Sequence, residues 1–364
     1  MPASAPNPPR FHPPPFDPSA PLLAIESSCD DTCAAVLKLD GTILSSVVSS
    51  QQIHSEFLGI VPELASREHL RLILPVISEA LEQAHVTTDD LVAVAVTNGP
   101  GLIGSLLVGL SAAKGLAYAR KIPIIGVNHI EAHLMSVLAE GPAEPPAVGL
   151  VVSGGHTELI DLPEWGEWSI LGATRDDAAG EAFDKVAKLL GLGFPGGPAI
   201  DRVAQAGSPD AIPFPRAMLD VAKGGLEFSF SGLKTAVKIF LDGDQRTALP
   251  EGSDERAAYV ADVAASFQTA VIDVLSAKIR AALHRTGYDR VFVCGGVACN
   301  SALRARLAAD AGSEGWALRI PSPKYCADNA VMVGLAGIHH FKRGEISTYA
   351  LPAMPNLDDW TGEY

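Results

Sequence analysis

The sequence predicts a duplicated α/β fold, because one order of strands and helices occurs twice along the chain. Each copy begins with three short strands joined by tight turns, and continues with helices that alternate with buried strands. The copies begin near residues 22 and 147, about 125 residues apart. Their side chains differ, so the prediction rests on the pattern alone.

The first copy opens on LLAIESSCDDTCAAVLKLDGTILSSVVSS, whose short apolar runs between turn residues are typical of strands. In order, we expect strands over residues 22–27, 32–39 and 42–49, a helix over 62–85, a strand over 91–97, a helix over 105–119 and a strand over 122–127. Asn128 follows the last strand, and its side chain is suited to cap a helix that begins after it.

The second copy repeats this order with longer helices. We expect strands over residues 147–153, 157–162 and 167–173, helices over 176–190 and 254–286, a strand over 290–294, a glycine turn and a helix from Asn300. The polar stretch 243–253 is expected to be a surface loop.

Composition restricts the class of protein. The 364 residues are enough for two domains. The sequence contains no run of about 18 apolar residues, so we expect no transmembrane helix. The first residues lack a basic stretch followed by an apolar run, so no secretory signal is expected, and residues 1–21 are dense enough in proline to predict a disordered arm. Five cysteines, an odd number, indicate reduced thiols of a cytosolic protein. The net charge of −15 argues against nucleic-acid binding by bulk electrostatics.

His129 and His133 are spaced four residues apart directly after a predicted buried strand. Residues four apart share one face of a helix, so both imidazoles can reach one metal ion, with a third ligand from elsewhere. The alternative is a coincidental or surface pair. A zinc protease would need a glutamate directly after the first histidine, whereas Glu131 lies two residues on, about 200° round the helix.

The motif Gly99-Pro100-Gly101-Leu102-Ile103-Gly104 matches G-x-G-x-x-G between a strand and a helix. A dinucleotide site would also need an acidic residue about 20 residues on, and would use the first strand–helix unit. The chain meets neither condition, so we interpret the motif as a tight turn.

Three other turns are rich in glycine or acid: Cys29 to Thr32, Ser153 to Thr157, and Gly295 to Asn300. Glycine lets a phosphate or nucleoside approach backbone N–H groups, and a helix N-terminus adds partial positive charge. Two such hairpin turns and a Gly-Gly turn before a helix are the layout of an actin-like nucleotide-binding fold.

Two further features have ordinary structural explanations. The helix over residues 176–190 carries Asp177 and Asp184, and an Asp184–Lys188 pair on a solvated face would account for the latter. The PGGP turn after it is rigid and poor in Cβ atoms. Asp328, which precedes an apolar helix, is by itself best interpreted as a helix cap.

Taken together, the motifs resemble one family. They are IESSCDDT, VPELASREH, TNGPGLIGSLLVG, NHIEAHL, VVSGGHTEL, DDAAGEAFDKVAKLLGL, PGGPAID, FSFSGLKTA, CGGVACNSALR and CADNAVM. In this order, over about residues 22–345, they look like the motifs of the bacterial TsaD family, the tRNA N6-adenosine threonylcarbamoyltransferases once described as O-sialoglycoprotein endopeptidases.

The resemblance implies the actin/Hsp70/sugar-kinase (ASKHA) fold, α/β with two lobes around a nucleotide cleft. It divides the chain into a proline-rich arm (1–21), a first lobe (22–128), a second lobe with the metal and nucleotide site (129–345) and a C-terminal tail (346–364). It also implies one divalent transition metal, iron or zinc, held by His129, His133 and Asp328, so Asp328 is expected to be a ligand rather than a cap.

The remaining site residues follow from the same resemblance. The expected substrate and nucleotide contacts are Val151, Val152, Ser153, Gly154, Gly155, Asp184, Gly197, Asp201 and Asn300. The catalytic carboxylates are Asp30 and Asp31, where Asp31 replaces the glutamate usual in the family.

The implied reaction transfers threonylcarbamoyl from threonylcarbamoyl-AMP to N6 of the adenosine 3′ of the anticodon, in tRNAs that read codons beginning with A. The implied partners are tRNA, a paralogous TsaB-like subunit, a TsaE-like ATPase with ATP and Mg²⁺, and a TsaC-type enzyme, all cytoplasmic and without a membrane. The competing hypothesis is an actin-fold ATPase or kinase that acts on a partner protein. A metalloprotease is the more distant alternative.

Overall fold

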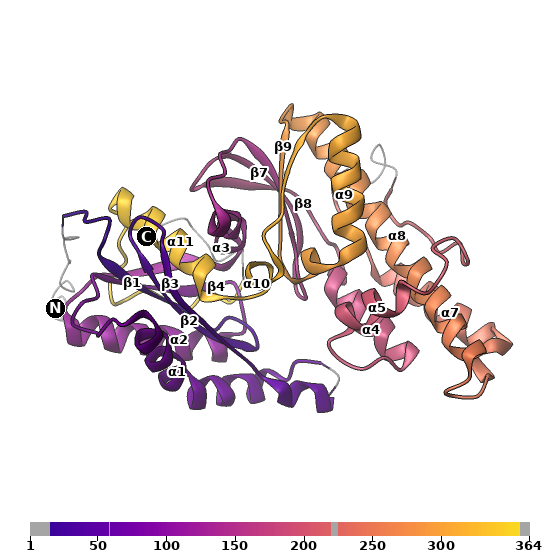
Figure 1. Ribbon diagram of the computed structural model, residues 1–364, viewed down its shortest axis with the longest axis horizontal. Coiled ribbons are helices and arrows are strands. Elements are labelled where there is room, and N and C mark those ends of the chain that lie inside the picture. The colour runs from indigo at the N-terminus through magenta and orange to yellow at the C-terminus, as the bar shows by residue number, and fades with distance from the viewer. Residues whose placement is uncertain (1–14, 58, 220–224, 357–364) are drawn as a thin grey trace, which may run out of the picture. The chain divides into compact units, whose positions relative to one another are not determined.

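The computed structural model describes residues 15–57, 59–219 and 225–356, and these form two compact units (Figure 1). Unit 1 comprises Met1–Ile53, Ile60–Gly141 and Asp328–Tyr364, and unit 2 comprises His54–Gly59 and Pro142–Ala327. Residues 1–14 of the expected proline-rich arm and residues 357–364 of the expected tail lie outside the described part of the chain.

Unit 1 contains a five-stranded sheet in the order β3-β2-β1-β4-β5. Its strands are β1 (Pro21–Glu26), β2 (Asp31–Lys38), β3 (Ile43–Ser50), β4 (Ala93–Gly99) and β5 (Ile124–Asn128). β1, β2 and β3 pair antiparallel, whereas β4 lies parallel to β1 and β5 parallel to β4.

Helices cover both faces of this sheet. They are α1 (Pro62–Ala84), α2 (Ile103–Arg120), α3 (His129–Met135) and α11 (Ala330–Arg343), with the short 3-10 helix η2 (Ser136–Glu140) directly after α3. A second 3-10 helix, η1 (Gln52–Phe57), begins in unit 1 and continues into the segment of unit 2 that starts at His54. Leu23 and Ile25 of β1 join the apolar core under α1 and α2, while Leu22 and Ala24 face α11 on the other side (Figure 1). A sheet buried on both faces explains why β1 is apolar at successive positions.

Unit 2 repeats the topology of unit 1. Its sheet has the order β10-β9-β6-β7-β8, with antiparallel β6–β7–β8 and parallel β6–β9–β10 pairs. The strands are β6 (Ala147–Val152), β7 (Thr157–Glu164), β8 (Glu167–Ala173), β9 (Arg290–Cys294) and β10 (Ala317–Arg319). Read from the third strand of each copy, both sheets have the same order and the same directions, which confirms the predicted duplication.

The helices of unit 2 pack around a large apolar core in which Phe183 and Phe267 meet edge to face. They are α4 (Ala179–Leu190), α5 (Gly196–Ala204), α7 (Ser231–Gly243), α8 (Asp254–Thr286), α9 (Ser301–Glu314) and α10 (Pro323–Cys326), with 3-10 turns η3 (Gln245–Ala248) and η4 (Gly296–Cys299). α8 is long and apolar enough to cross a membrane, but 78% of its most apolar window is buried inside unit 2, as expected of a core helix.

The structure differs from the sequence prediction in several elements, and Pro21, which was expected to belong to the disordered arm, opens β1. α5 begins inside the glycine-rich segment that we interpreted as a rigid turn, and η3 forms within the expected loop 243–253. α7 and the three-residue strand β10 were not predicted. The expected lobe boundaries also differ from the compact units, because α3 and α11 belong to unit 1.

Candidate metal centre and glycine-turn site

The helix α3 begins where β5 ends, and Asn128 sets that boundary. Its Oδ1 accepts hydrogen bonds from the backbone N–H groups of Ile130 (2.8 Å) and Glu131 (3.2 Å), so the predicted cap is confirmed. With the helix start fixed, His129 and His133 lie one turn apart on one face, with ring centroids 4.6 Å apart. Both side chains are buried.

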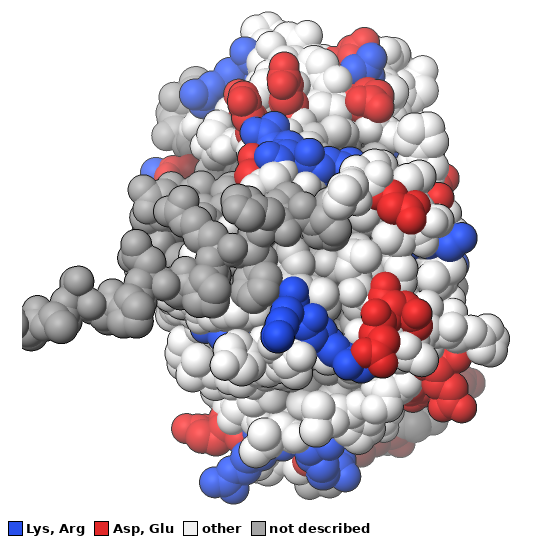
Figure 2. Space-filling view, turned by 90° about the vertical axis from the view of Figure 1, so that its left-hand side faces the viewer, with Lys and Arg blue, Asp and Glu red and all other residues white. Residues whose placement is uncertain are grey.

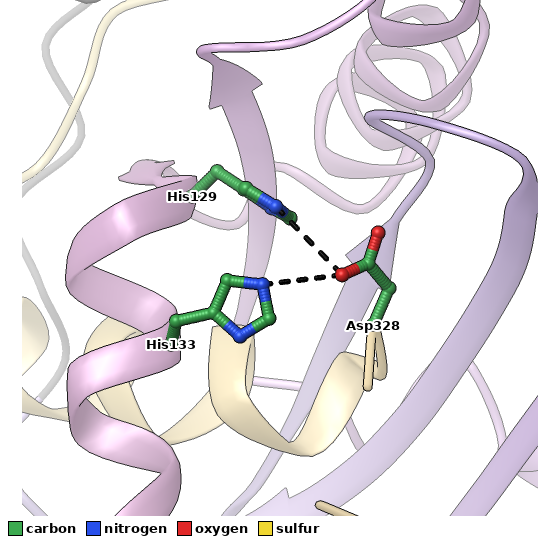
Figure 3. A group of neighbouring side chains, drawn as sticks. All are labelled: His129, His133 and Asp328. Atoms are coloured by element: carbon green, nitrogen blue, oxygen red, sulfur yellow. Dashed lines mark ion pairs between the residues drawn. The ribbon is translucent and has the colours of Figure 1, made fainter. Parts of the chain in front are cut away.

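Asp328 completes a three-residue group with the two histidines (Figure 3). Its Oδ1 lies 3.1 Å from Nε2 of His133 and 3.8 Å from Nε2 of His129, and one ligand atom from each residue lies within 4.8 Å of the others. The helix-cap interpretation of Asp328 is wrong, because Asn329 caps α11 by accepting from the N–H of Met332 (3.1 Å). The carboxylate of Asp328 points at the histidines instead (Figure 3).

The chemistry of this group fits a transition-metal ion. Burial lowers the pKa of His133, so its imidazole is neutral near pH 7, which is the form that binds metals. Within the described residues Nδ1 of His133 is buried without a hydrogen-bond partner. Two imidazoles and one carboxylate that converge within a buried site are a donor set that divalent iron or zinc accepts.

A buried glutamate that the sequence analysis missed lies behind His129. Oε2 of Glu26 is 3.2 Å from Nδ1 of His129, and the Ser28 hydroxyl is 3.1 Å from the same nitrogen. Glu26 is fully buried, and it also accepts from the Thr97 hydroxyl (2.6 Å) and from the N–H of Ser28. Burial acts to raise the pKa of Glu26, but the His129 ring beside it holds that pKa below its usual value. Glu26 therefore orients His129 so that Nε2 faces Asp328.

Asp30 and Asp31 lie where the chain turns from β1 into β2, and Asp31 opens β2 opposite Ser50. Burial, and then the negative charge of Asp328, raise the pKa of Asp31 to about 7. The charge of the metal-ligand residue Asp328 therefore acts on Asp31, although Asp31 is not one of the three ligands.

In unit 2 the expected contact residues lie on several elements that touch one another. Val151 and Val152 are fully buried strand residues, whereas Gly154 and Gly155 are exposed, with no atom where a Cβ would stand. The N-terminus of α4 lies against this turn, because the N–H of Gly180 donates to the Ser153 carbonyl (3.1 Å). A Cβ on Gly180 would stand 2.5 Å from that oxygen, so the close approach requires glycine.

The Gly-Gly turn after β9 reaches the same strand end. Gly295 has φ +94°, and a Cβ there would stand 2.3 Å from the Val152 carbonyl oxygen. Asn300 follows this turn and caps α9 by accepting from the N–H of Leu303 (2.9 Å), while its Nδ2 donates to Gln268 (2.6 Å).

The two aspartates of this group join helices to one another. Oδ1 of Asp184 accepts from the N–H of Gly196 (2.7 Å) and so connects α4 to α5. Asp201 accepts from the backbone N–H and the hydroxyl of Ser301 (3.0 and 2.8 Å), and so ties α5 to α9. Gly197, beside Gly196, has open space at its Cβ position. These contacts connect the exposed glycines of the turns into one surface of unit 2, the glycine-turn site.

Several basic residues that could contact a polyanion are paired with carboxylates. Lys234 pairs with Asp177 (2.7 Å), Arg71 with Glu68 (2.6 Å), and Arg306 with Asp273 and Asp310. On the face drawn in Figure 2, lysines and arginines lie among acidic and uncharged residues rather than in one basic area.

Comparison with known proteins gives one consistent result. A family described as "TsaD: tRNA N6-adenosine threonylcarbamoyltransferase" matches residues 42–335. A protein of that name from Geobacter sulfurreducens is 54% identical over 336 residues, 92% of this chain and 96% of the relative. Another from Clostridioides difficile is 48% identical over 337 residues, 92% of this chain and 97% of the relative.

Solved structures show the fold class. HypF from T. kodakarensis has a TM-score of 0.61 at 14% identity, covering 93% of this chain and 50% of that one. The (R)-2-hydroxyglutaryl-CoA dehydratase component A of Acidaminococcus fermentans has a TM-score of 0.50 at 16% identity, covering 90% of this chain and 99% of that one. At such identities the likeness concerns the fold alone, and it confirms the expected actin-like α/β class.

Proposed function

Because this chain belongs to the TsaD family of tRNA N6-adenosine threonylcarbamoyltransferases, we propose that it transfers threonylcarbamoyl from threonylcarbamoyl-AMP to tRNA. The acceptor is N6 of the adenosine 3′ of the anticodon, in tRNAs that read codons beginning with A. The observation that carries the proposal is the buried group of His129, His133 and Asp328, which comes from two of the motifs that the chain shares with the family. A kinase of this fold needs a site for phosphate and magnesium, and does not need two histidines and an aspartate as metal ligands.

The three residues would hold one divalent ion per chain, iron by resemblance to the family or zinc as the alternative. A metal bound there supplies Lewis acidity and a fixed positive charge for the oxygens of the acyl group. Glu26 keeps His129 in the orientation that this binding needs. Exocyclic adenine amines are poor nucleophiles, because the lone pair is delocalised into the ring, so an activated mixed anhydride is the donor that fits.

We assign the nucleotide end of the donor to the glycine-turn site. Gly154, Gly155 and Gly296 are exposed and have free space at the Cβ position, so phosphate oxygens can reach their N–H groups. Such donors stabilise the negative charge that AMP gains as it leaves. The contacts assigned here are Val151 and Val152 through their backbone, Ser153, Gly154, Gly155, Asp184, Gly197, Asp201 and Asn300.

Asp30 and Asp31 are the proposed catalytic carboxylates. A carboxyl group whose pKa is about 7, as at Asp31, exchanges protons readily at neutral pH, and the acceptor amine must lose a proton as the new bond forms. The shorter side chain of Asp31, where the family usually has glutamate, keeps the charge of the site.

A paralogous TsaB-like subunit is the proposed protein partner of unit 1. Four large apolar side chains on α1 and α2 face solvent: Leu70 (71% exposed), Leu74 (66%), Ile103 (48%) and Leu107 (49%). Ser66 of α1 lies against Gly104 of α2, which brings these side chains to one two-helix surface. An apolar surface of this kind marks a protein interface. The TsaE-like ATPase, with ATP and Mg²⁺, and the TsaC-type enzyme that supplies the donor complete a cytoplasmic pathway.

The proposed activity is tested by incubating the metal-loaded chain and a TsaB-like subunit with threonylcarbamoyl-AMP and an unmodified tRNA. Nucleoside analysis should show threonylcarbamoyladenosine, and a tRNA with guanosine at the acceptor position should give none. ATP hydrolysis that is stimulated by a partner protein, without any modified nucleoside, would instead favour an actin-fold ATPase. Running the reaction with the Geobacter sulfurreducens relative checks that the substrates are competent.

A further inference from the structure

Two cysteines of unit 2 form a pair that the proposed reaction does not use. Cys299 ends the 3-10 turn η4 and Cys326 ends α10, and these two elements contact each other. Both sulfur atoms lie against the segment 321–323. Sγ of Cys326 is 3.2 Å from the carbonyl oxygen of Pro321, and Sγ of Cys299 is 3.7 Å from the carbonyl oxygen of Pro323. The fold therefore brings the two cysteines to the same short segment, although they are far apart in the sequence.

A guanidinium group is fixed beside this pair. Nη2 of Arg304 lies 3.2 Å from Sγ of Cys326, and its Nε donates to the Ala298 carbonyl (2.7 Å). Nη2 also donates to the carbonyl of Pro321. Because backbone acceptors hold the guanidinium in place, its positive charge stays next to the sulfurs, where it stabilises a thiolate.

The thiols of the chain differ in pKa and in exposure. The hydrogen bond from Cys326, together with the charge of Arg304, lowers the pKa of Cys299 to about 7 against the opposing effect of burial. Burial raises the pKa of Cys29, Cys33 and Cys294. Cys299 is also partly exposed, whereas Cys326 is buried. One thiol is thus reachable and ionisable, with a second thiol directly behind it.

We propose that Cys299 and Cys326 form a peroxide-sensitive dithiol, in which Cys299 reacts first and Cys326 then closes a disulfide. The Cys299 thiolate attacks one oxygen of hydrogen peroxide, the O–O bond breaks, and the departing hydroxide takes a proton to become water. Cys299 is then a sulfenic acid. The sulfur of Cys326 attacks that sulfur, and the Cys326 proton leaves with the hydroxyl group as a second water. Two thiols and one peroxide thus give one disulfide and two waters.

The disulfide would connect two segments that carry site residues. Asn300 directly follows Cys299, and Asp328 follows Cys326 by two residues. If the proposed function is correct, oxidation joins the turn of the glycine-turn site to the segment that leads to the metal ligand Asp328. The disulfide then restricts the motion of both segments. Turnover should then fall at least tenfold on oxidation and recover on reduction with dithiothreitol.

The linkage is tested directly by mass spectrometry of the purified full-length chain. After treatment with limiting hydrogen peroxide, a non-reducing digest should contain the Cys299 and Cys326 peptides joined, lighter by two hydrogen atoms than the reduced pair. The Cys326→Ser variant should accumulate a sulfenic acid at Cys299 that dimedone traps, because the second thiol is missing. The matched control Cys294→Ser, which removes another buried thiol of unit 2, should form the linkage at the wild-type rate.

Three results would overturn the proposal: a first disulfide that excludes Cys299, oxidation of Cys299 to sulfinic acid without a linkage, or equal peroxide consumption by Cys299→Ser and wild type. The mass readout does not depend on activity. A reduced chain that forms the linkage but modifies no tRNA would therefore contradict the proposed function and leave the dithiol intact. A linked chain with full turnover would contradict the effect on the site.

Discussion

Glu26 shows how one buried side chain prepares the metal centre. Its carboxylate faces Nδ1 of His129, so the residue stabilises the ring orientation in which Nε2 is available to a metal. We expect Glu26→Gln to weaken metal affinity about 10- to 100-fold, because the neutral amide attracts the ring proton less than a carboxylate does. Titration with a competing chelator, followed by elemental analysis, measures this change.

The control for Glu26 is Glu158→Gln, which neutralises a buried glutamate on β7 of unit 2 and should leave metal affinity unchanged. His133→Ala should bind no stoichiometric metal. Equal metal content in wild type and His133→Ala would show that the three-residue group is not the metal site.

The buried carboxyl group of Asp31 is expected to lower the stability of the folded chain at neutral pH. Its pKa in the folded chain is about 7, above the 3.8 of an ordinary aspartate, so the folded state binds the proton more tightly than the unfolded state does. The stability from this residue is complete below about pH 4 and is lost as the pH rises towards 7, by up to about 4 kcal/mol. In the metal-free protein, Asp31→Asn should therefore raise the free energy of unfolding at pH 8 and flatten its pH dependence, as urea titrations from pH 4 to 8 would show.

The same substitution should lower turnover about 100-fold or more, since the amide cannot accept a proton. An Asp31→Asn chain that is both less stable at pH 8 and fully active would contradict the assignment.

At the scale of secondary-structure elements, α11 lies close on the sheet of unit 1 because two glycines remove side chains at the contact. A Cβ on Gly337 would stand 2.4 Å from the Cβ of Ala95, and one on Gly334 would stand 2.4 Å from Cδ1 of Leu37. We expect Gly337→Ala to lower the free energy of unfolding by about 1–3 kcal/mol, because the helix or the strand must shift to admit the methyl group.

Gly312→Ala is the matched control, because this glycine is also inside a helix, α9, and has no atom within 4 Å of the Cβ position. It should stabilise the protein by about 0.5–1 kcal/mol through helix propensity alone. Urea denaturation of both variants distinguishes a packing effect from a backbone effect. Similar stabilisation by both substitutions would show that α11 does not need the close contact.

At the scale of the whole molecule, the net charge of −15 opposes binding to tRNA. Several of the basic side chains that the sequence offers are already paired with carboxylates, as Lys234 and Arg306 are. We expect the isolated chain to bind tRNA weakly, with an affinity that falls steeply with salt, and the TsaB-like subunit to strengthen binding at least tenfold. Filter binding at two salt concentrations, with and without the subunit, measures both effects.

The double variant Leu70→Asp/Leu74→Asp should lose the gain from the subunit, because two charges then face the apolar interface. Ile239→Asp, at a residue of α7 that is 67% exposed, provides the control and should retain it. Tight, salt-insensitive binding by the isolated chain would show that no partner is needed.

Local patterns were enough to predict most of the fold. Apolar runs bounded by turns predicted the strands of both sheets except β10, and helical spacing matched α8 from Asp254 to Thr286. The i, i+4 histidines and the Asn128 cap are likewise local, since a strand end and one helical turn define them. Duplication followed from the order of these elements, because equal orders of strands produce equal sheets.

Tertiary structure decided the features that depend on partners distant in the sequence. α5 forms in a glycine-rich segment because Asp184 accepts from its first N–H group and its apolar face packs in the core of unit 2. Asp328 resembles a cap in the sequence, but Asn329 takes that role and leaves Asp328 to face the histidines. The sequence did not indicate a role for Glu26, because it is a single acidic residue at the end of an apolar strand. The pairing of β1 with β4 places it beside Thr97, and β5 leads into the helix that brings His129 to it. A buried charge needs hydrogen-bonding partners, and only the folded chain assembles them.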